Sequence, residues 1–296
     1  MSSIFISIAS YRDPDIINTV KSCYDNAIDK NNLFFSIVSQ GETEEHPNLS
    51  FIPHNQLSLV KHHWSESKGV CWARAIANKN INRDYFLQID SHSRFIEGWD
   101  KLIISNYENA KSFWGSRLIL TNYPDMFIIN WETNPPSDEF KGYEELKSIK
   151  VTWDNEDIMP KSHNEWPNVI DKINGDEHGF FAAGSVFCSS FLMKEIPYDE
   201  NIYFIGEEAS MAIRAYTRGI RLVSPTVKYM FTNYDRENSK RQLHWQNNIS
   251  WSELNQSSYK RLEKIMKGDK TMGIFGIDSE SLYHQYKKFL SLKFKN

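Results

Sequence analysis

The chain has 296 residues, a formal net charge of −4 and a hydrophobic fraction of 40%. This length is enough to bury a large core, and the weak negative charge offers no basic face to a nucleic acid. The aromatic fraction of 14% suits a protein with a ligand groove, although composition alone does not establish one.

The cysteines and the apolar runs indicate a reducing compartment and no membrane span. The three cysteines, Cys23, Cys71 and Cys188, form no CxxC pair, and their odd number argues against a disulfide framework. The apolar run at residues 4–10 is too short for a secretion signal, and no stretch is long enough to cross a bilayer. We therefore expect a soluble, cytoplasmic protein. The basic and apolar tail, residues 287–296, fits a solvated helix end, but it can also rest on the inner face of an anionic membrane.

The N-terminal part of the chain alternates between strand and helix patterns. Short apolar runs predict strands, and apolar residues at helical spacing predict helices between them. The expected strands are residues 4–10, 33–40, 49–55 and 84–90, and the expected helices are residues 16–28 and 69–81. Strands that alternate with helices imply an α/β fold, a mainly parallel sheet with helices on both faces.

The middle of the chain has a different character. The segment from Trp131 to Glu177 has no clear period and is rich in Asn, Pro and acidic residues, so we expect an ordered excursion over the site or a mobile lid. The pattern then predicts a strand of small residues, a turn at Pro197, an apolar segment ending at Gly206, a helix over 207–217 and a strand near 221–223.

The C-terminal part is polar and helical in pattern beyond Arg236. The sequence has no internal repeat and no low-complexity linker. We therefore expect a catalytic domain over residues 1–236 and a helical C-terminal extension over residues 237–296.

Polar clusters follow three of the predicted strands at the points where those strands end. They are SYRD at residues 10–13, SQG at 39–41 and DSH at 90–92. In open α/β sheets, ligands bind outside the carboxyl ends of the strands. The three clusters should therefore meet at one edge of the sheet and form a binding site.

Asp90 and His92 have the spacing of two neighbouring metal ligands. Residues i and i+2 of a strand project to the same side, so the carboxylate and the imidazole can share one divalent cation. Mixed oxygen and nitrogen ligands suit Mn²⁺, whereas Mg²⁺ prefers oxygen alone. A solvated strand end gives the same short pattern. The buried run before the pair and the polar ends of the other strands favour the metal site.

Two further sets of charged residues are candidates for the same edge. Gly206, Glu207 and Glu208 open a predicted helix, where the dipole favours carboxylates, so they are either ordinary helix-terminal charge or contacts to a sugar and a reacting carbon. The guanidinium groups near strand ends are suited to a diphosphate, but they serve equally well in surface ion pairs. These basic residues are Arg12, Arg74 and Arg94.

Several common motifs are absent from the sequence. It has no P-loop, no GxGxxG after the first strand, no GxSxG and no HExxH. Their absence weakens NTPase, dehydrogenase, hydrolase and zinc-protease functions. A nucleotidyltransferase is also disfavoured, because SYRDPD is not the glycine- and lysine-bearing loop that such enzymes usually need.

The motifs, taken in chain order, resemble those of one enzyme family. SYRD, CWAR, LQIDSHSRF, FFAAG, PYD, FIGEE, RAYTRG and a following SP, between Ile4 and Arg236, resemble the hydroxyproline-polypeptide N-acetylglucosaminyltransferases and their bacterial relatives. The DSH also looks like the metal motif of the polypeptide N-acetylgalactosaminyltransferases. The resemblance implies a GT-A fold and transfer of N-acetylglucosamine from a UDP-sugar with a divalent metal, with retention of configuration.

The resemblance also implies roles for individual residues. Asp90 and His92 would hold the metal beside the nucleotide diphosphate. Glu207 and Glu208 would face the donor sugar or the reaction centre, and Gly184 of FFAAG would lie against the sugar. The residues that would line the nucleotide pocket are Ser10, Tyr11, Arg12, Gln40 and Arg74.

The sequence departs from the family pattern at one position. The family usually has a His after the SP, in an H-x-Y-x-R ending that can complete the metal shell. Here the ending is FTNYDR, with Tyr234 and Arg236 in place but Thr232 where the His would fall. Thr232 or a water molecule can fill that place, His244 can reach in from the C-terminal extension, or the metal is bound more weakly. The sequence leaves these alternatives open.

The expected function is metal-dependent glycosyl transfer from a UDP-sugar to a hydroxyl acceptor, with the cation stabilising the leaving UDP. If configuration is inverted instead, Glu207 or Glu208 would be the general base. Family precedent suggests a protein acceptor, whereas the Asn-, Lys- and Ile-rich composition is typical of a low-GC bacterium and favours a surface polysaccharide or a lipid-linked glycan. The alternative function is a non-catalytic module that binds a nucleotide sugar or a glycan.

Overall fold

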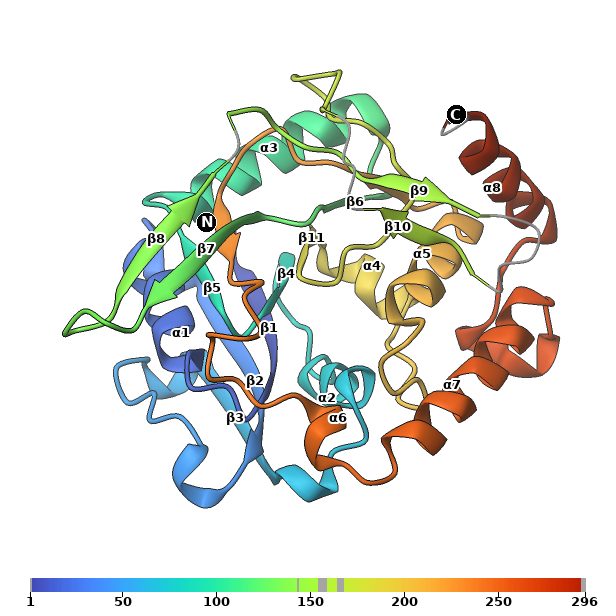
Figure 1. Ribbon diagram of the computed structural model, residues 1–296. Helices are drawn as coiled ribbons and strands as arrows, with labels where there is room; N and C mark the ends of the chain where they lie inside the picture. Colours follow the sequence, from blue (N-terminus) through green and yellow to red (C-terminus); the bar gives the residue numbers. More distant parts are fainter. Residues whose placement is uncertain (1, 143, 154–158, 164–167, 294–296) are drawn as a thin grey trace.

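A mixed sheet forms the centre of the protein (Figure 1). The computed structural model describes residues 2–142, 144–153, 159–163 and 168–293. The sheet has seven strands in the order β12-β6-β11-β4-β1-β2-β3. Their bounds are β1 (Ile4–Tyr11), β2 (Leu33–Gly41), β3 (Leu57–His63), β4 (Tyr85–Asp90), β6 (Leu118–Thr121), β11 (Ser185–Ser189) and β12 (Arg221–Val223).

Most neighbouring strands of this sheet run parallel. β1 pairs in parallel with β2 and β4, β2 with β3, and β12 with β6, whereas β11 is antiparallel to both β4 and β6. The register places Tyr11 opposite Gln40, and Ala9 opposite Asp90. The carboxyl ends of β1, β2 and β4 therefore meet at one edge, as the polar clusters predicted.

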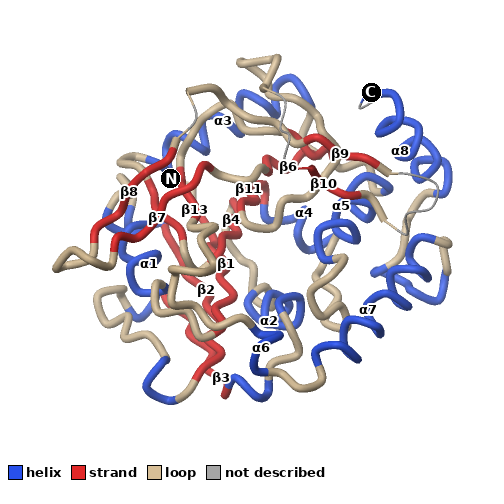
Figure 2. Tube along the Cα trace, viewed as in Figure 1, coloured by secondary structure: helices blue, strands red, loops and turns tan. Residues whose placement is uncertain are grey.

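Helices cover both faces of the sheet, so the α/β fold with flanking helices is confirmed (Figure 2). In Figure 1, α1 and α3 lie on one side of the sheet, and α2, α4 and α5 lie on the other. These helices are α1 (Ile16–Asp25), α2 (Val70–Ala77), α3 (Trp99–Trp114), α4 (Ser190–Glu195) and α5 (Glu207–Thr217). Short 3-10 turns occur at Lys30–Asn32, Thr43–Glu45, His54–Gln56, Trp64–Glu66 and Lys270–Phe275.

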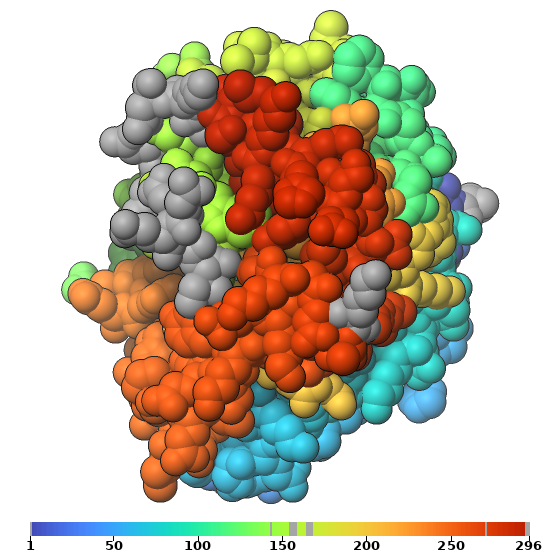
Figure 3. Space-filling view, turned by 90° about the vertical axis from the view of Figure 1, so that its right-hand side faces the viewer, coloured from blue at the N-terminus to red at the C-terminus, as the bar shows by residue number. Residues whose placement is uncertain are grey.

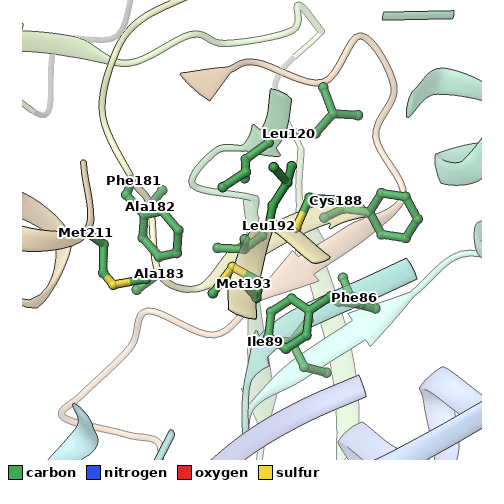
Figure 4. Packing of buried hydrophobic residues seen from close by; sticks show 14 of the residues in the cluster. Phe86, Ile89, Leu120, Phe181, Ala182, Ala183, Cys188, Leu192, Met193 and Met211 are labelled. Atoms are coloured by element: carbon green, nitrogen blue, oxygen red, sulfur yellow. The ribbon is translucent and has the colours of Figure 1, made fainter. Parts of the chain in front are cut away.

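The largest buried cluster joins the sheet to the helices that pack on it. Figure 4 shows Phe86 and Ile89 of β4 near Leu192 and Met193 of α4, and Met211 of α5 farther away, next to Ala183. The side chains of these β4, α4 and α5 residues are buried, with at most 2% of their surface exposed. This packing holds β4, whose last residue is Asp90, rigidly against its neighbours.

The described part of residues 131–177, for which the sequence predicted no regular structure, contains β8 (Ser137–Lys141), β9 (Lys150–Thr152) and β10 (Lys161–His163). A second sheet has the order β5-β13-β7-β8, and β9 pairs with β10 in a third. The other strands of the second sheet are β5 (Ser93–Phe95), β7 (Asp125–Asn130) and β13 (Met230–Thr232). Residues 143, 154–158 and 164–167 of this segment lie outside the described part.

One strand was predicted in the wrong place. Residues 49–55 form no strand, and β3 begins at Leu57 instead. Leu49 and Ile52 are buried beneath the loop rather than in the sheet, which explains the misleading apolar run. β3 is the edge strand and carries polar residues along most of its length, so its apolar signal is weak.

The C-terminal part is helical and packs on the rest of the chain. It contains α6 (His244–Asn247), α7 (Trp251–Met266) and α8 (Glu280–Lys293). Figure 3 shows α7 and α8, in orange and red, lying across the surface of the body. Leu262 and Ile265 of α7, and Tyr286 and Leu290 of α8, belong to the main buried cluster.

The described helices include none with the length and apolar character needed to span a membrane. In the basic tail, Leu290 is 2% exposed, and the ring of Phe289 packs 5.7 Å from the ring of Tyr216. These apolar residues of α8 therefore face the protein, and among the large apolar residues of 287–293, the described part of this stretch, Leu292 alone is exposed. Residues 294–296 lie outside the described part.

Candidate active site

The Asp90 carboxylate and the His92 imidazole face each other at the end of β4. Asp90 Oδ2 lies 3.9 Å from His92 Nε2. The other ring nitrogen, His92 Nδ1, is 2.8 Å from Asp13 Oδ2, and Ser91 Oγ donates to the same oxygen at 2.6 Å. Burial opposes the ionisation of Asp13, but the hydrogen bonds from His92 and Ser91 outweigh it and lower the pKa of that carboxyl. Asp13 thus fixes the ring so that Nε2 points toward Asp90.

These residues fit a divalent cation. A carboxylate that orients the far nitrogen of a histidine is the usual support of a metal-binding imidazole. The separation of 3.9 Å is within twice a metal–ligand bond of about 2.1 Å, so one ion can contact both atoms. Thr232 pairs with Ser93 in the ladder of β13 and β5 and is fully buried, and its Oγ1 has no hydrogen-bond partner among the described residues. Within the described ranges, no group of three His, Cys, Asp or Glu side chains is arranged around a metal position.

Arg74 joins Asp90 to the start of α5. Its Nη2 donates to Asp90 Oδ1 at 3.0 Å, and its Nη1 donates to Glu207 Oε1 at 2.7 Å. The Arg74 side chain is 4% exposed and that of Glu207 is 7% exposed, so this is a buried ion pair. Nη1 also contacts the Ala183 carbonyl and the Tyr198 hydroxyl. Burial alone would lower the pKa of Arg74, but Glu207 and Asp90 raise it, so the guanidinium stays charged.

Glu208 has a different environment from Glu207. Its Oε1 accepts from the Ala183 backbone N–H at 2.9 Å, and its Oε2 accepts from the Tyr123 hydroxyl at 2.7 Å. No arginine contacts it in the part of the chain that the structure describes. Burial raises the pKa of Glu208 to about 7, so it changes charge near neutral pH. The two neighbouring glutamates are therefore an ion-paired carboxylate and a titratable one.

Gly184 lies directly against Asp90. A Cβ atom at position 184 would be 2.8 Å from Asp90 Oδ2, closer than side-chain carbons approach in proteins. The preceding residue, Ala183, accepts hydrogen bonds from Arg74 and from Gln88 through its carbonyl. The FFAAG segment thus passes between Asp90 and Glu208 and needs a glycine at this point.

Four of the five predicted nucleotide residues lie at the ends of β1 and β2, whereas the fifth, Arg74, lies on α2 beside Asp90 and Glu207. Ser10 and Gln40 are buried, and Gln40 Nε2 donates to the Ser10 carbonyl at 3.3 Å. Tyr11 Oη and Gln40 Oε1 are buried and have no hydrogen-bond partner within the described ranges. Arg12 instead contacts Glu45 through both Nε and Nη2, at 2.8 to 3.1 Å, so its charge is already balanced.

His244 is not brought together with Asp90 and His92. Its Nδ1 is 2.6 Å from the Tyr203 hydroxyl, and its ring packs against the rings of Phe204, Trp245 and Tyr11. Burial lowers the pKa of His244 to about 4, so the ring is neutral. Its Nε2 is buried without a partner in the described part of the chain. His244 therefore lies beside Tyr11, one of the predicted nucleotide residues, and forms no group of three possible metal ligands with Asp90 and His92 within the described residues.

Arg94 also has a structural role rather than a position in the site. It donates to both carboxylate oxygens of Asp15 at 2.8 Å and, through Nε, to Asp138 at 2.7 Å. These ion pairs join β5 to the N-terminal end of α1 and to β8.

A family model and several solved structures match the chain. The model is described as Glycosyltransferase (GlcNAc), and it matches residues 3–58 and 50–287. The protein belongs to this glycosyltransferase family. No curated protein sequence matches the chain at a significant level.

The solved structures show that this family member has a GT-A fold. GalNAc-T7 with UDP, GalNAc and Mn2+ matches with 14% identity and a TM-score of 0.60, over 99% of this chain and 56% of that one. TarS of S. aureus matches with 13% identity and a TM-score of 0.54, over 99% and 44%. TarS 1-349 of S. aureus in complex with UDP matches with 13% identity and a TM-score of 0.50, over 92% and 74%. The chain thus spans about half the length of the first two structures.

The sequence analysis of this glycosyltransferase missed some residues of the site. Asp13 was part of SYRD, but only the folded turn shows that it supports His92. Tyr123 lies outside every quoted motif and donates to Glu208. Tyr198, in PYD, contacts both Arg74 and Gln88. Tyr123 follows β6, which the sequence analysis did not predict, so strand-end polarity could have identified it only after that strand was recognised.

Proposed function

We propose that this glycosyltransferase transfers N-acetylglucosamine from a UDP-sugar to a hydroxyl group with the help of a divalent cation. The observation that supports this most directly is the facing pair of Asp90 and His92, with Asp13 behind the imidazole. Beside this pair, the buried polar atoms of Tyr11 and Gln40 lack partners in the described part of the chain, as expected for side chains that bind a polar ligand.

Asp90 and His92 would hold the cation, and Mn²⁺ suits their oxygen and nitrogen atoms. A divalent cation bound there supplies positive charge to the diphosphate of a leaving UDP. Arg74 positions Asp90 through its Oδ1 and leaves Oδ2 to face His92. Asp13 holds the imidazole in one orientation.

The nucleoside would bind at the ends of β1 and β2. Ser10, Tyr11 and Gln40 would form the floor of this pocket, and His244 would close it with its unpartnered Nε2. Arg12 would act mainly through its ion pair with Glu45, which fixes the loop after β2.

The donor sugar would lie between Gly184 and Glu208. Glu207 is committed to Arg74, so it is not the group that takes a proton from an acceptor. Glu208, whose pKa burial raises to about 7, would be the general base if configuration were inverted. Retention, which the family resemblance favours, would have a phosphate oxygen of the leaving group receive the acceptor proton. Glu207 would act as a positioning residue, and Glu208 would contact the sugar.

The acceptor we propose is a hydroxyl of a surface glycan, a lipid-linked glycan or a protein. A cytoplasmic location is supported by the three cysteines, which are free and buried. Contact of the C-terminal tail with a membrane would depend on its lysines, because Phe289 and Leu290 pack on the protein.

The proposed function is tested by UDP release from UDP-N-acetylglucosamine with and without EDTA. Wild type should depend on Mn²⁺, and Asp90→Ala should lose about 100-fold in rate, since loss of the support of a metal ligand alone costs about 10–100-fold. Asp25→Ala, which removes an exposed carboxylate on α1, is the control. Full activity in Asp90→Ala would contradict the metal site. A donor that binds but is never hydrolysed or transferred would favour the non-catalytic binding module.

A further inference from the structure

The segment of residues 233–244, here called the crossing segment, connects the proposed metal pair to the proposed nucleoside pocket. At its start, the Asn233 backbone N–H donates to the His92 carbonyl at 2.9 Å. At its end, the His244 ring lies 6.2 Å from the ring of Tyr11. Figure 1 shows the crossing segment, in orange, running in front of β1 and β2 to α6. It therefore passes over the edge of the sheet where the polar strand ends meet.

The backbone of the crossing segment is held by its own polar groups. Asp235 Oδ1 accepts from the N–H groups of Glu237 and Asn238, and Lys240 has a left-handed φ of 58°. Arg241 follows at once. Its Nε donates to Ser239 Oγ at 3.0 Å, and its Nη2 donates to the Asp235 carbonyl at 3.2 Å. These contacts fix the guanidinium group of Arg241 relative to the segment.

Arg241 differs from Arg12, Arg74 and Arg94 in having no ion pair within the described residues. Arg74 and Arg94 are both joined directly to carboxylates, at 2.7 to 3.0 Å. Arg241 contacts no carboxylate, although Asp13, Asp90 and Asp15 all favour its charge. Burial opposes them and lowers the pKa of Arg241. Its guanidinium is thus half-buried, near three carboxylates, and paired with none of them.

A diphosphate at this edge would bring negative charge that the proposed cation alone does not balance. Asp90 lies beside the proposed cation and Asp13 lies behind the His92 imidazole, so these two carboxylates already offset the charge of one divalent ion. A guanidinium group is the side chain best suited to phosphate oxygens, because its fork of N–H donors matches their geometry. Arg241 is the half-buried guanidinium in this region, within the described residues, whose charge is not already balanced by an ion pair.

We propose that Arg241 binds the diphosphate of the nucleotide donor and balances the charge of the carboxylates at the end of β4. This inference rests on the proposed function and adds to it a residue of the C-terminal extension. The extension then contributes two side chains to the donor site: Arg241 contacts the diphosphate, and His244 closes the nucleoside pocket.

The test is the affinity for UDP and for uridine, measured by titration calorimetry in Mn²⁺. Arg241→Ala should weaken UDP binding at least about tenfold, since hydrogen bonds to charged groups contribute this much or more. Uridine affinity should be unchanged, because uridine has no phosphate. Arg241→Lys should lie between wild type and Arg241→Ala. Arg83→Ala is the matched control, since Arg83 is a half-buried arginine that precedes β4 at the opposite end of the sheet and lies over the ring of Phe34.

Three results would overturn the proposal. If Arg241→Ala binds UDP as wild type does, the diphosphate contact is wrong while the proposed function stands. If Arg241→Ala loses uridine and UDP affinity equally, Arg241 supports the fold of the pocket instead. If wild type binds neither UDP nor UDP-N-acetylglucosamine, the proposed function fails and the role of Arg241 fails with it. Unchanged uridine affinity also shows that the variant is folded.

Discussion

The two carboxylate oxygens of Asp90 face different partners, so a substitution close to Asp90 can disturb either contact. Oδ1 accepts from Arg74 at 3.0 Å, and Oδ2 faces His92 at 3.9 Å. Gly184 fills the remaining space, with a hypothetical Cβ only 2.8 Å from Oδ2. The orientation of the proposed metal ligand therefore depends on the absence of a side chain at position 184.

Gly184→Ala should displace the Asp90 carboxylate and weaken Mn²⁺ binding by about tenfold, the lower range for a disturbed support of a metal ligand. Its backbone φ is not in the left-handed region, so the alanine adds a steric contact without backbone strain. Gly142→Ala is the control, because the nearest atom to its Cβ would be 3.6 Å away. Mn²⁺ binding is measured by electron paramagnetic resonance. Equal Mn²⁺ affinity in wild type and Gly184→Ala would show that Asp90 Oδ2 is not a ligand.

The free energy of unfolding should fall as the pH rises, because Glu208 then loses a proton that the folded state binds tightly. Its pKa is about 7 in the folded protein against an ordinary value of 4.5, so the folded state binds the proton more tightly. Stability from this group is full below about pH 4.5 and is lost as the pH rises through 7. Glu208→Gln cannot ionise, so its free energy of unfolding should gain on wild type by about 1–2 kcal/mol between pH 5 and 8. Urea unfolding at several pH values measures this. A constant difference across that range would mean that Glu208 titrates normally.

At the residue scale, the sequence predicted that the side chains of Asp90 and His92 lie together, and they do. The reason differs from strand alternation, because β4 ends at Asp90 and His92 lies in the bend before β5. The support from Asp13 depends on the turn after β1, where Arg12 adopts a left-handed φ of 45°. The environment of His244 depends on contacts with Tyr203 and Tyr11, which are far away in sequence. No local pattern records such contacts.

Arg74 connects three elements, and this is its main effect on the fold. It lies on α2 and contacts Asp90 at the end of β4 and Glu207 at the start of α5. A buried guanidinium between two carboxylates keeps these elements in a fixed relation. Removing it would leave the Glu207 carboxylate buried without a counter-charge.

Arg74→Met should lower the free energy of unfolding by about 3–5 kcal/mol, the usual cost of breaking a buried ion pair. Adding Glu207→Gln should restore part of this loss, because the unpaired charge is then removed. Arg117→Met is the matched control, since Arg117 pairs with Glu195 at the surface, where such pairs contribute about 0–1 kcal/mol. Urea unfolding gives all four values. If the double variant were less stable than Arg74→Met, the unpaired Glu207 would not be the cause.

At the element scale, prediction succeeded where an apolar pattern had clear limits. The helix at residues 207–217 and the strand at 221–223 have the predicted bounds, because Gly206 and Gly219 mark their ends. β3 was misplaced because an edge strand is mostly polar, and α4 was missed because it follows β11 with no intervening turn residue. Within residues 131–177, β8 pairs with β7 and β9 pairs with β10, and β7 in turn pairs with β13. The stability of these short strands therefore depends on their partners, which a single strand's own pattern does not show.

At the scale of the whole molecule, the C-terminal helices are part of the main core. The division at Arg236 came from a change in composition, which says nothing about packing. In the structure, Leu262 is fully buried against Gly206, where an added Cβ would lie 2.0 Å from Leu262 Cδ1. Tyr286 donates to the Gly179 carbonyl at 2.6 Å. α7 and α8 therefore support the start of α5 and the approach to FFAAG.

A chain that ends at Arg236 should fail to fold cooperatively, because it would expose the surface that α7 and α8 cover. Burying one large apolar side chain stabilises a protein by about 1.5–3 kcal/mol, so four such residues contribute about 6–12 kcal/mol. This is comparable to a typical total stability of about 5–15 kcal/mol, and the lost hydrogen bonds add to it. The buried residues concerned are Leu262, Ile265, Tyr286 and Leu290.

Circular dichroism during thermal unfolding should show no sharp transition for residues 1–236. Leu292→Ser in the full chain, which alters an exposed residue of α8, should unfold as wild type does. A truncated chain with a sharp transition that still binds UDP would show that residues 1–236 form an independent domain, and that Arg241 and His244 are not needed for the donor.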